Sequence, residues 1–351
     1  MNGQLSNENE TSAKGVITRP VEKDEDGVRL DRWFKRHYPG LGHVQLEKLL
    51  RTGQVRLDGK RAKSGDRVAV GQAVRVPPQI AHAPPREQRS HAEPEFANQD
   101  KDFVQGLVIY KDSSVIVLNK PSGLATPGGT GLTRHIDGML DALAFGKKQR
   151  PRLVHRLDRD TSGALVIART VPAAAALAES LRRRDASKIY WALTKGVPRP
   201  HQGTIKLALA KEGGHGPRGQ DERMVAAERH DEGAKHAITD YAVLGQAGQK
   251  YGWVAAKPVT GRTHQIRVHL AAIGTPIVGD FKYGGEQSRG MGEIEDRLHL
   301  HARSIDIAHP EGGRLTVTAP LPEHMLKTWK LLGFDPESTA DPFAAMRRKK
   351  K

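Results

Sequence analysis

The sequence predicts an α+β protein with a small N-terminal module and a larger domain built on a mixed, mainly antiparallel sheet flanked by helices. The chain has 351 residues, a length typical of two domains. Residues 21–80 show helical periodicity followed by a hairpin signal, and from Lys101 onward short alternating apolar segments are separated by Gly and Pro. These observations together indicate two domains of different construction.

The N-terminal module is predicted to contain two helices and a hairpin. Trp33 and Phe34 belong to a first helical pattern, and a second one ends before Gly53, where a left-handed helix C-cap favours glycine. The dipeptide Asp58-Gly59 then joins two alternating segments, which is a strong signal for a tight hairpin.

Five segments follow from changes in composition. Polar runs and prolines set the boundaries. We expect a disordered leader over 1–20, the small module over 21–80, a linker over 81–100, the larger domain over 101–335 and a basic tail over 336–351.

The larger domain is predicted to contain short strands and a few helices. The clearest strands are Leu107–Ile109, Val115–Leu118, Ala164–Ala168, Tyr190–Leu193 and Trp253–Val259. A helix over 173–184 is expected to start after Thr170 as its N-cap, and another is expected to start near Thr263 as its cap. On the fourth strand Tyr190 and Trp191 must point to opposite faces, so one of them is expected in the core.

Charge and composition narrow the class of partner. The chain carries 56 Lys and Arg against 40 Asp and Glu, a net charge of +16, which favours a polyanion such as nucleic acid. It has no Cys, which excludes disulfides, a thiolate nucleophile and Cys-ligated metals. No stretch of about 18 apolar residues occurs, so we expect no membrane association and a cytoplasmic protein.

Half of the excess charge lies in residues 28–80, where twelve Lys and Arg stand against four acids, a net of +8. A phosphate-facing surface is predicted from Arg29, Arg32, Lys48, Arg51, Arg56, Lys60 and Arg61. On charge alone, a solvated pair of amphipathic helices is an equally good interpretation. The stretches 29–34 and 53–60 resemble an S4 (αL-like) domain. This resemblance implies that the module binds structured RNA by contacts to the RNA backbone.

Two segments carry candidate chemistry. His155-Arg-Leu-Asp-Arg-Asp-Thr-Ser-Gly163 lies between a short apolar piece and a strand, so it is expected to be a loop that presents Asp158 and Asp160. A polar turn is the favoured interpretation for Asp160 and Ser162, with Gly163 at positive φ, whereas spacing alone leaves Asp158 open.

The second segment runs from Thr260 to Leu270. His264 and Arg267 are three residues apart and therefore share a helix face, close to an N-terminus that favours anions.

Together with three further stretches, these segments resemble the RluA/RluC/RluD-type pseudouridine synthases. The five motifs, in the family's order, are Val117-Leu-Asn-Lys-Pro-Ser-Gly123, the 155–163 segment, Lys188-Ile-Tyr190, Thr260 to His269 and Leu298-His-Leu-His-Ala302. The match covers 108–321, and Gly128-Gly-Thr-Gly-Leu132 is more similar to the RluC branch than to the RluD branch. Lys111 and Ala125-Thr126-Pro127 depart from the usual pattern.

The resemblance implies isomerisation of uridine to pseudouridine in 23S ribosomal RNA, free or in an assembling large subunit. It implies that Asp158 is the catalytic carboxylate, acting as nucleophile or through a glycal intermediate, two mechanisms that the sequence leaves open. Tyr190 would stack on the flipped base and Arg267 would pair with Asp158. Supporting roles are implied for Arg156 and His155, and places in the substrate groove for Lys120, Thr161, Arg262 and His264.

We expect no cofactor, no metal, no obligate protein partner and a monomer. One rival is a metal hydrolase that uses Asp158 and histidines. Its candidate ligands are His155, His264, His269, His299 and His301. The other rival is a non-catalytic RNA-binding or ribosome-assembly factor that keeps the fold.

Overall fold

The structure is a computed structural model that describes residues 17–22, 25–38, 40–81, 95–127, 134–183, 185–213, 223–228, 231, 233–339 and 342–343. It contains two compact units, Met1–Pro94 and Glu95–Lys351. The stretch 128–132, which is similar to the RluC branch, and the basic residues 347–351 lie outside the described residues. None of the helices described is long and apolar enough to span a membrane.

The first unit packs helices against a four-stranded sheet of order β1-β4-β2-β3. Its elements are β1 (Ile17–Pro20), α1 (Leu30–His37), α2 (His43–Arg51), β2 (Arg56–Leu57), β3 (Lys60–Arg61), β4 (Ala73–Val76) and α3 (Pro78–Ala81). The fully buried Trp33 and Phe34 of α1 meet Leu46 and Leu50 of α2 in one core. This amphipathic pairing explains why two short helices are stable here.

The local turn predictions in this unit are confirmed. Asp58 and Gly59 connect β2 to β3 with φ of 47° and 73°, the paired positive values of a type I′ turn. Gly53 follows the last turn of α2 with φ of 70°.

Three predicted boundaries are wrong. Ile17–Pro20, placed in the leader, forms β1 and pairs antiparallel with β4. Helix α4 (Glu95–Gly106) begins inside the predicted linker. Phe343, placed in the tail, is 4 % exposed and packs with Trp253 and Trp329. In each case a short segment is ordered by a distant part of the chain, which local composition does not reveal.

The second unit is built on an eleven-stranded sheet. The main order is β11-β10-β12-β13-β9-β14-β8-β6-β5, with β15 paired to β14 and β7 to β8. The strands are β5 (Val108–Lys111), β6 (Val115–Lys120), β7 (Arg152–Leu153), β8 (Ser162–Ala168), β9 (Ser187–Lys195), β10 (Gln202–Glu212), β11 (Arg223–Ala227), β12 (Lys235–Ala247), β13 (Tyr251–Pro258), β14 (Leu300–Ala308) and β15 (Arg314–Thr318). Every pairing is antiparallel except β14 with β8, so the predicted mixed, mainly antiparallel sheet is confirmed.

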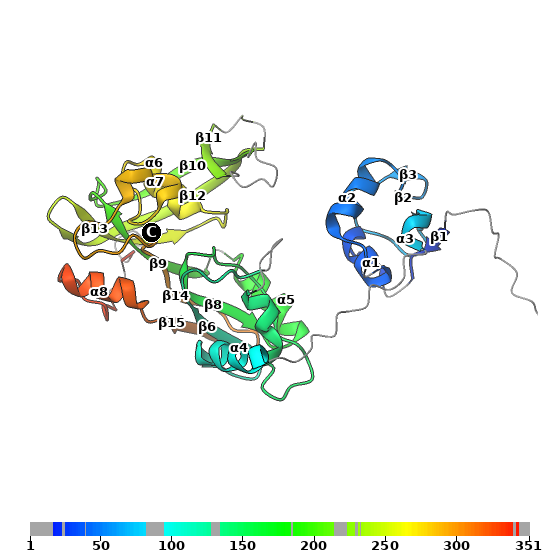
Figure 1. Cartoon of the computed structure of the whole chain (residues 1–351), viewed down its shortest axis with the longest axis horizontal. Coiled ribbons are helices and arrows are strands. Elements are labelled where there is room, and N and C mark those ends of the chain that lie inside the picture. The colour runs from blue at the N-terminus through cyan, green and yellow to red at the C-terminus, as the bar shows by residue number, and fades with distance from the viewer. Residues whose placement is uncertain are drawn as a thin grey trace, which may run out of the picture. The chain divides into compact units, whose positions relative to one another are not determined.

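Helices cover both faces of this sheet (Figure 1). They are α4, η2 (Ile136–Leu143), α5 (Val171–Ser180), α6 (Gln265–Ala272), α7 (Phe281–Gly284), η3 (Gly285–Ser288) and α8 (Glu323–Leu331). Alternation along β6 sends Val115 and Val117 to the core under α5, and Ile116 and Leu118 to the opposite core under η2. Helix α5 begins after Thr170, whose side chain accepts from Ala173 N at 3.2 Å, as predicted.

In the other half of the sheet, α6 and α8 cover opposite faces. Ile266 and Leu270 of α6 pack with Val254 of β13. Trp329 of α8 packs with Trp253 on the other side, where adjacent residues of β13 point the other way.

The parallel contact between β8 and β14 requires a glycine. Gly163 has φ of 109°, and a Cβ there would lie 2.3 Å from the carbonyl oxygen of Ala302. The predicted positive φ of Gly163 is therefore confirmed, and a close approach of backbones adds a second reason for it. The loop that carries Asp158 enters the sheet at this point.

Candidate active site

A cavity of about 290 Å³ lies where three segments of the second unit meet. The segments are the loop before β8, strand β9 and the connection from β13 into α6. The lining residues are His155, Arg156, Leu157, Asp158, Thr161, Leu181, Lys188, Tyr190, Pro258, Thr260, Gly261, Arg262, Thr263, His264, Gln265, Ile266, Arg267 and Leu300. The fold therefore brings together eight of the nine residues for which the resemblance implied a role, the exception being Lys120.

Lys120 lies beneath the loop that carries Asp158 and not in the cavity. Its side chain is fully buried, and its Nζ donates to the carbonyl oxygens of Pro121 at 2.9 Å, Leu124 at 2.7 Å and Arg159 at 2.9 Å. Burial lowers the pKa of Lys120 to about 7, although the negative charges of Asp160 and Asp158 raise it in part. The predicted place of Lys120 in the substrate groove is wrong because strand β6 turns this side chain into the interior.

Thr126 holds the same loop from another side. Its hydroxyl donates to the carbonyl oxygen of Leu157 at 2.8 Å and accepts from Leu157 N at 3.2 Å. Both bonds fix the residue immediately before Asp158. Thr126 belongs to the tripeptide that departs from the family pattern, and nothing in its local sequence indicated this contact.

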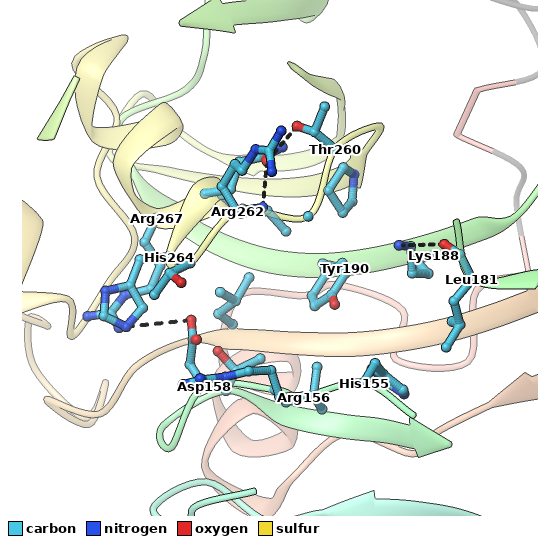
Figure 2. A pocket seen from close by; sticks show the side chains of 18 residues that line it. His155, Arg156, Asp158, Leu181, Lys188, Tyr190, Thr260, Arg262, His264 and Arg267 are labelled. Carbon is cyan, nitrogen blue, oxygen red and sulfur yellow. Dashed lines mark hydrogen bonds and ion pairs between the residues drawn. The ribbon is translucent and has the colours of Figure 1, made fainter. Parts of the chain in front are cut away.

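Asp158 approaches His264 at one end of the cavity (Figure 2). Its Oδ2 lies 3.8 Å from His264 Nε2, and its side chain is 20 % exposed. Arg267 was expected to pair with Asp158, but it does not contact Asp158 directly. Its Nε and Nη2 donate to both oxygens of Asp280 at 2.8 and 2.7 Å, and the charge of Asp158 acts on it from farther away.

The start of α6 differs from the predicted cap. The N-cap residue is His264, not Thr263, and it has φ of 53° with no side-chain hydrogen bond to the helix. Gln265 stabilises this turn: its Oε1 accepts from Thr260 Oγ1 at 2.6 Å and from Arg262 N at 3.1 Å. Its Nε2 donates to Ile238 O at 2.8 Å and Thr239 Oγ1 at 2.9 Å. Sequence reasoning missed Gln265 because two of its four partners, Ile238 and Thr239, lie on the distant strand β12.

Tyr190 lies between the two ends of the cavity, as Figure 2 shows. Its neighbour Trp191 points to the opposite face and packs with Trp329, so the prediction that one of the two aromatics is in the core is confirmed. Burial, with the charge of Asp158 adding to it, raises the pKa of Tyr190 well above its usual value. Tyr190 therefore presents a neutral phenol ring to the cavity.

Lys188 and His155 lie toward the other end. Burial lowers the pKa of Lys188, and burial together with the charge of Lys188 lowers the pKa of His155 to about 4. His155 is thus neutral near pH 7. Its Nε2 accepts from Val166 N at 2.9 Å, which ties the loop to β8.

Thr161 has a hydroxyl without a partner. The residue is 2 % exposed, lines the cavity, and its Oγ1 makes no hydrogen bond to any of the described residues. A buried hydroxyl of this kind is costly unless something binds to it. Arg156 and Arg262, by contrast, are exposed at the cavity.

The histidines of the metal-hydrolase rival are bonded to protein groups. His299 contacts Arg297 O and Thr328 Oγ1 at 2.7 and 3.0 Å. His301 contacts Ser162 Oγ at 2.9 Å, and neither residue lines the cavity. Among the described residues no group of three His, Cys, Asp or Glu side chains is placed to hold a metal ion.

Comparison with known proteins gives a consistent result. Residues 114–272 match the family described as RNA pseudouridylate synthase. The chain is 35 % identical to the ribosomal large subunit pseudouridine synthase C of Pasteurella multocida, over 88 % of this chain and 91 % of that protein. It is 33 % identical to the protein of the same name from Escherichia coli K12, over 89 % and 95 % of the two chains.

A solved structure of human RNA pseudouridylate synthase domain containing 4 has a TM-score of 0.57 at 28 % identity. It covers 68 % of this chain and 98 % of the human one. These matches together show an isomerase, a pseudouridine synthase that acts on RNA. The chain belongs to the RNA pseudouridine synthase family, of the RluA/RluC type, which confirms the resemblance drawn from its motifs.

Proposed function

We propose that this protein isomerises uridines of large-subunit (23S) ribosomal RNA, with Asp158 as the catalytic carboxylate. The observation that carries the proposal is the presence of Asp158 and Tyr190 in one cavity of about 290 Å³. The isomerisation breaks the bond from N1 to C1′, rotates the uracil and joins C5 to C1′. It needs one carboxylate at C1′ and one surface that holds the base.

The target base leaves its stack to reach Asp158. The cavity is at the small end of ligand pockets, which run from about 300 to 1,000 Å³, so it suits one nucleotide and not a helix. Flipping a base costs a few kcal/mol, and stacking on an aromatic ring returns about 1–3 kcal/mol. Stacking on the neutral ring of Tyr190 therefore offsets much of the cost of extrusion.

Positive side chains around the cavity support an RNA substrate. Arg156 and Arg262 are exposed at the cavity, and Lys188 lies within it. Such groups attract the phosphates that flank a flipped nucleotide. The ribosomal specificity rests on the relatives, several of which are named ribosomal large subunit pseudouridine synthase C.

The first unit is proposed to bind RNA as an S4-like module. Its seven candidate cations, named above, are all exposed on α1, α2 and the β2–β3 hairpin or just beside them. Arg51, Arg61 and Lys63 line a hollow of about 450 Å³ between α2 and β3. A concave basic surface of this kind fits an RNA backbone.

Mapping pseudouridines tests the activity and the substrate together. Carbodiimide mapping of large-subunit RNA from cells that lack this protein is expected to show the loss of specific pseudouridines. Wild-type protein should restore them, and Asp158→Asn should not. An unchanged pseudouridine map would refute the ribosomal substrate, and restoration by Asp158→Asn would refute the role of Asp158.

The S4-like module is tested by charge removal. The double variant Arg51→Gln, Arg61→Gln should lower RNA affinity and reduce the slope of log K against log salt concentration by roughly two. Lys330→Gln on α8 removes the same kind of exposed charge in the other unit and serves as the control. Equal slopes for the double variant and the control would count against the module.

A further inference from the structure

We infer that Tyr283 and His264 form a hydrogen-bonded relay that presents a neutral imidazole N–H to Asp158, and that Tyr283 is a positioning residue for the reaction. The inference rests on the proposed role of Asp158. Tyr283 lies on α7 and does not line the cavity, so it would act only through His264.

The direction of the relay follows from the donors available. Met224 N donates to Tyr283 Oη at 3.3 Å, and His264 Nδ1 lies 2.6 Å from the same oxygen. These are the two hydrogen-bond partners of Tyr283 Oη among the described residues. Since the backbone N–H can only donate, the phenol proton goes to His264 Nδ1. The proton of a neutral His264 is therefore on Nε2.

That Nε2 faces the carboxylate. It lies 3.8 Å from Asp158 Oδ2, the contact drawn in Figure 2. The distance is longer than a direct hydrogen bond, but catalytic hydrogen bonds in unliganded sites are often long and shorten when substrate binds. A bound nucleotide that closes the cavity would shorten this contact.

The backbone and neighbouring charges hold both relay residues in place. His264 has φ of 53° at the start of α6, a conformation that few non-glycine residues adopt without support. The guanidinium of Arg267 lies 5.0 Å from the ring centre of Tyr283 and is itself fixed by two bonds to Asp280. The phenol ring is therefore held by a side chain that cannot easily move.

Burial, more than the charges that face it, favours the neutral form of His264. Burial is the largest cause of its lowered pKa. The charge of Asp158 opposes it, Arg267 and Lys282 add to it, and Asp280 also opposes it. A neutral donor orients the carboxylate without cancelling its charge. The relay thus supplies Asp158 with a donor and adds no positive charge beside it, which suits either mechanism at C1′.

Removing the phenol oxygen tests the relay. Tyr283→Phe keeps the ring over Arg267 and deletes only the acceptor and donor at Oη. Without it, Nδ1 loses the donor that favours the Nε2–H form, so the Nδ1–H tautomer, which turns a lone pair toward Asp158, becomes more populated. We expect kcat to fall about five- to tenfold with KM within twofold, as for the loss of one neutral hydrogen bond.

The diagnostic readout is the tautomer of His264. In protein labelled with ¹⁵N-histidine, the signal that disappears in His264→Gln identifies this residue among the 16 histidines. It should report the Nε2–H form in the full-length wild-type protein and a shift toward Nδ1–H in Tyr283→Phe. This measurement requires no turnover.

Three further variants complete the test. Tyr241→Phe removes a hydroxyl that donates to Pro200 O at 3.0 Å in the same unit, and should leave kcat unchanged. His264→Gln keeps a neutral N–H at the position of Nε2 and should retain more activity than His264→Leu. An equal loss of activity in His264→Gln and His264→Leu would overturn the relay.

The relay is also overturned if Tyr283→Phe keeps the wild-type kcat. It is overturned as well if Tyr283→Phe loses activity while the tautomer of His264 is unchanged, because that loss would be merely structural. Asp158→Asn is measured in parallel. If Asp158→Asn retains turnover, the proposed function fails. If it is inactive while Tyr283→Phe has wild-type kcat and tautomer, only the relay fails.

Discussion

Replacing Lys120 with methionine should lower both the stability and the turnover of the protein. The ammonium of Lys120 is fully buried and donates to the carbonyls of Pro121, Leu124 and Arg159, the last of which follows Asp158 directly. Methionine has a similar length but no donor. The substitution therefore removes the polar anchor of the catalytic loop while filling most of the same space.

The size of the stability loss follows from the carbonyl groups that lose Lys120 as their donor. Arg159 O also accepts from Gly123 N at 2.9 Å and keeps one partner. Pro121 and Leu124 lose their donor, and each acceptor left unpaired costs about 1–3 kcal/mol. The variant also avoids the cost of burying an ammonium, which reduces the total. We expect a net loss of about 2–4 kcal/mol in the free energy of unfolding of the second unit.

The loss should depend on pH. Burial lowers the folded pKa of Lys120 from 10.5 to about 7. Between these values the unfolded chain binds more protons than the folded protein, so the contribution of this group to stability rises with pH through that window. The variant lacks this group. The stability difference between wild type and Lys120→Met should therefore be larger at pH 9 than at pH 6.5.

Urea unfolding followed by tryptophan fluorescence measures the effect, because Trp191, Trp253 and Trp329 report on the core of the second unit. Turnover is measured on the same samples, and kcat should fall at least tenfold while the variant is still folded. Lys195→Met removes a half-buried lysine on β9 as the control. A Lys120→Met variant with wild-type stability and kcat would refute the assignment of Lys120 as the anchor of the loop.

Three other substitutions probe the site and its frame. Gly163→Ala places a Cβ 2.3 Å from Ala302 O and should lower the free energy of unfolding by about 3–5 kcal/mol, measured in urea. Gly312→Ala, also at positive φ but with no atom within 4 Å of the new Cβ, should lower it by only about 1 kcal/mol. Similar losses for the two variants would contradict the clash. Gln265→Leu removes the bonds from Gln265 to Thr260 and Arg262 in the 260–267 turn and to Ile238 and Thr239 on β12. It should raise KM and lower kcat in steady-state assays, and unchanged kinetics would show that the turn does not need these bonds. Thr161→Val removes a buried hydroxyl that has no partner, so the free energy of unfolding should rise by about 1 kcal/mol while kcat/KM falls about tenfold. An unchanged kcat/KM would show that substrate does not use this hydroxyl.

Features that depend on neighbouring residues could be predicted from the sequence. The hairpin at Asp58-Gly59, the positive φ of Gly53 and the N-cap at Thr170 all follow from local backbone chemistry. The opposite orientations of Tyr190 and Trp191 follow from strand alternation. Signals of this local kind predicted the start of α5 and, to within one residue, the cap of α6, but not the other helices of the second unit.

Features that depend on distant partners could not be predicted from the sequence. Strand β1 is ordered by pairing with β4, more than fifty residues away. Thr126 bonds to Leu157, and Gln265 bonds to Ile238 and Thr239 on β12; the residue types alone do not distinguish either from a surface residue.

The site itself was predicted in composition but not in its pairing. The motifs indicated Asp158, Tyr190, His264 and Arg267, and the fold places all four around one cavity. The direct ion pair of Arg267 is nevertheless with Asp280, because the first turn of α6 aims the guanidinium there and leaves His264 nearest to Asp158.

The most direct test of the account compares Asp158→Asn with wild type for turnover and RNA affinity in the same buffer. Turnover is measured as the release of tritium from C5 of uridine in a large-subunit RNA transcript. If Asp158 is the catalytic carboxylate, Asp158→Asn should show no detectable release and a Kd for RNA within about twofold of wild type, because Asn keeps the size and removes the carboxylate. Release at a substantial fraction of the wild-type rate would contradict it.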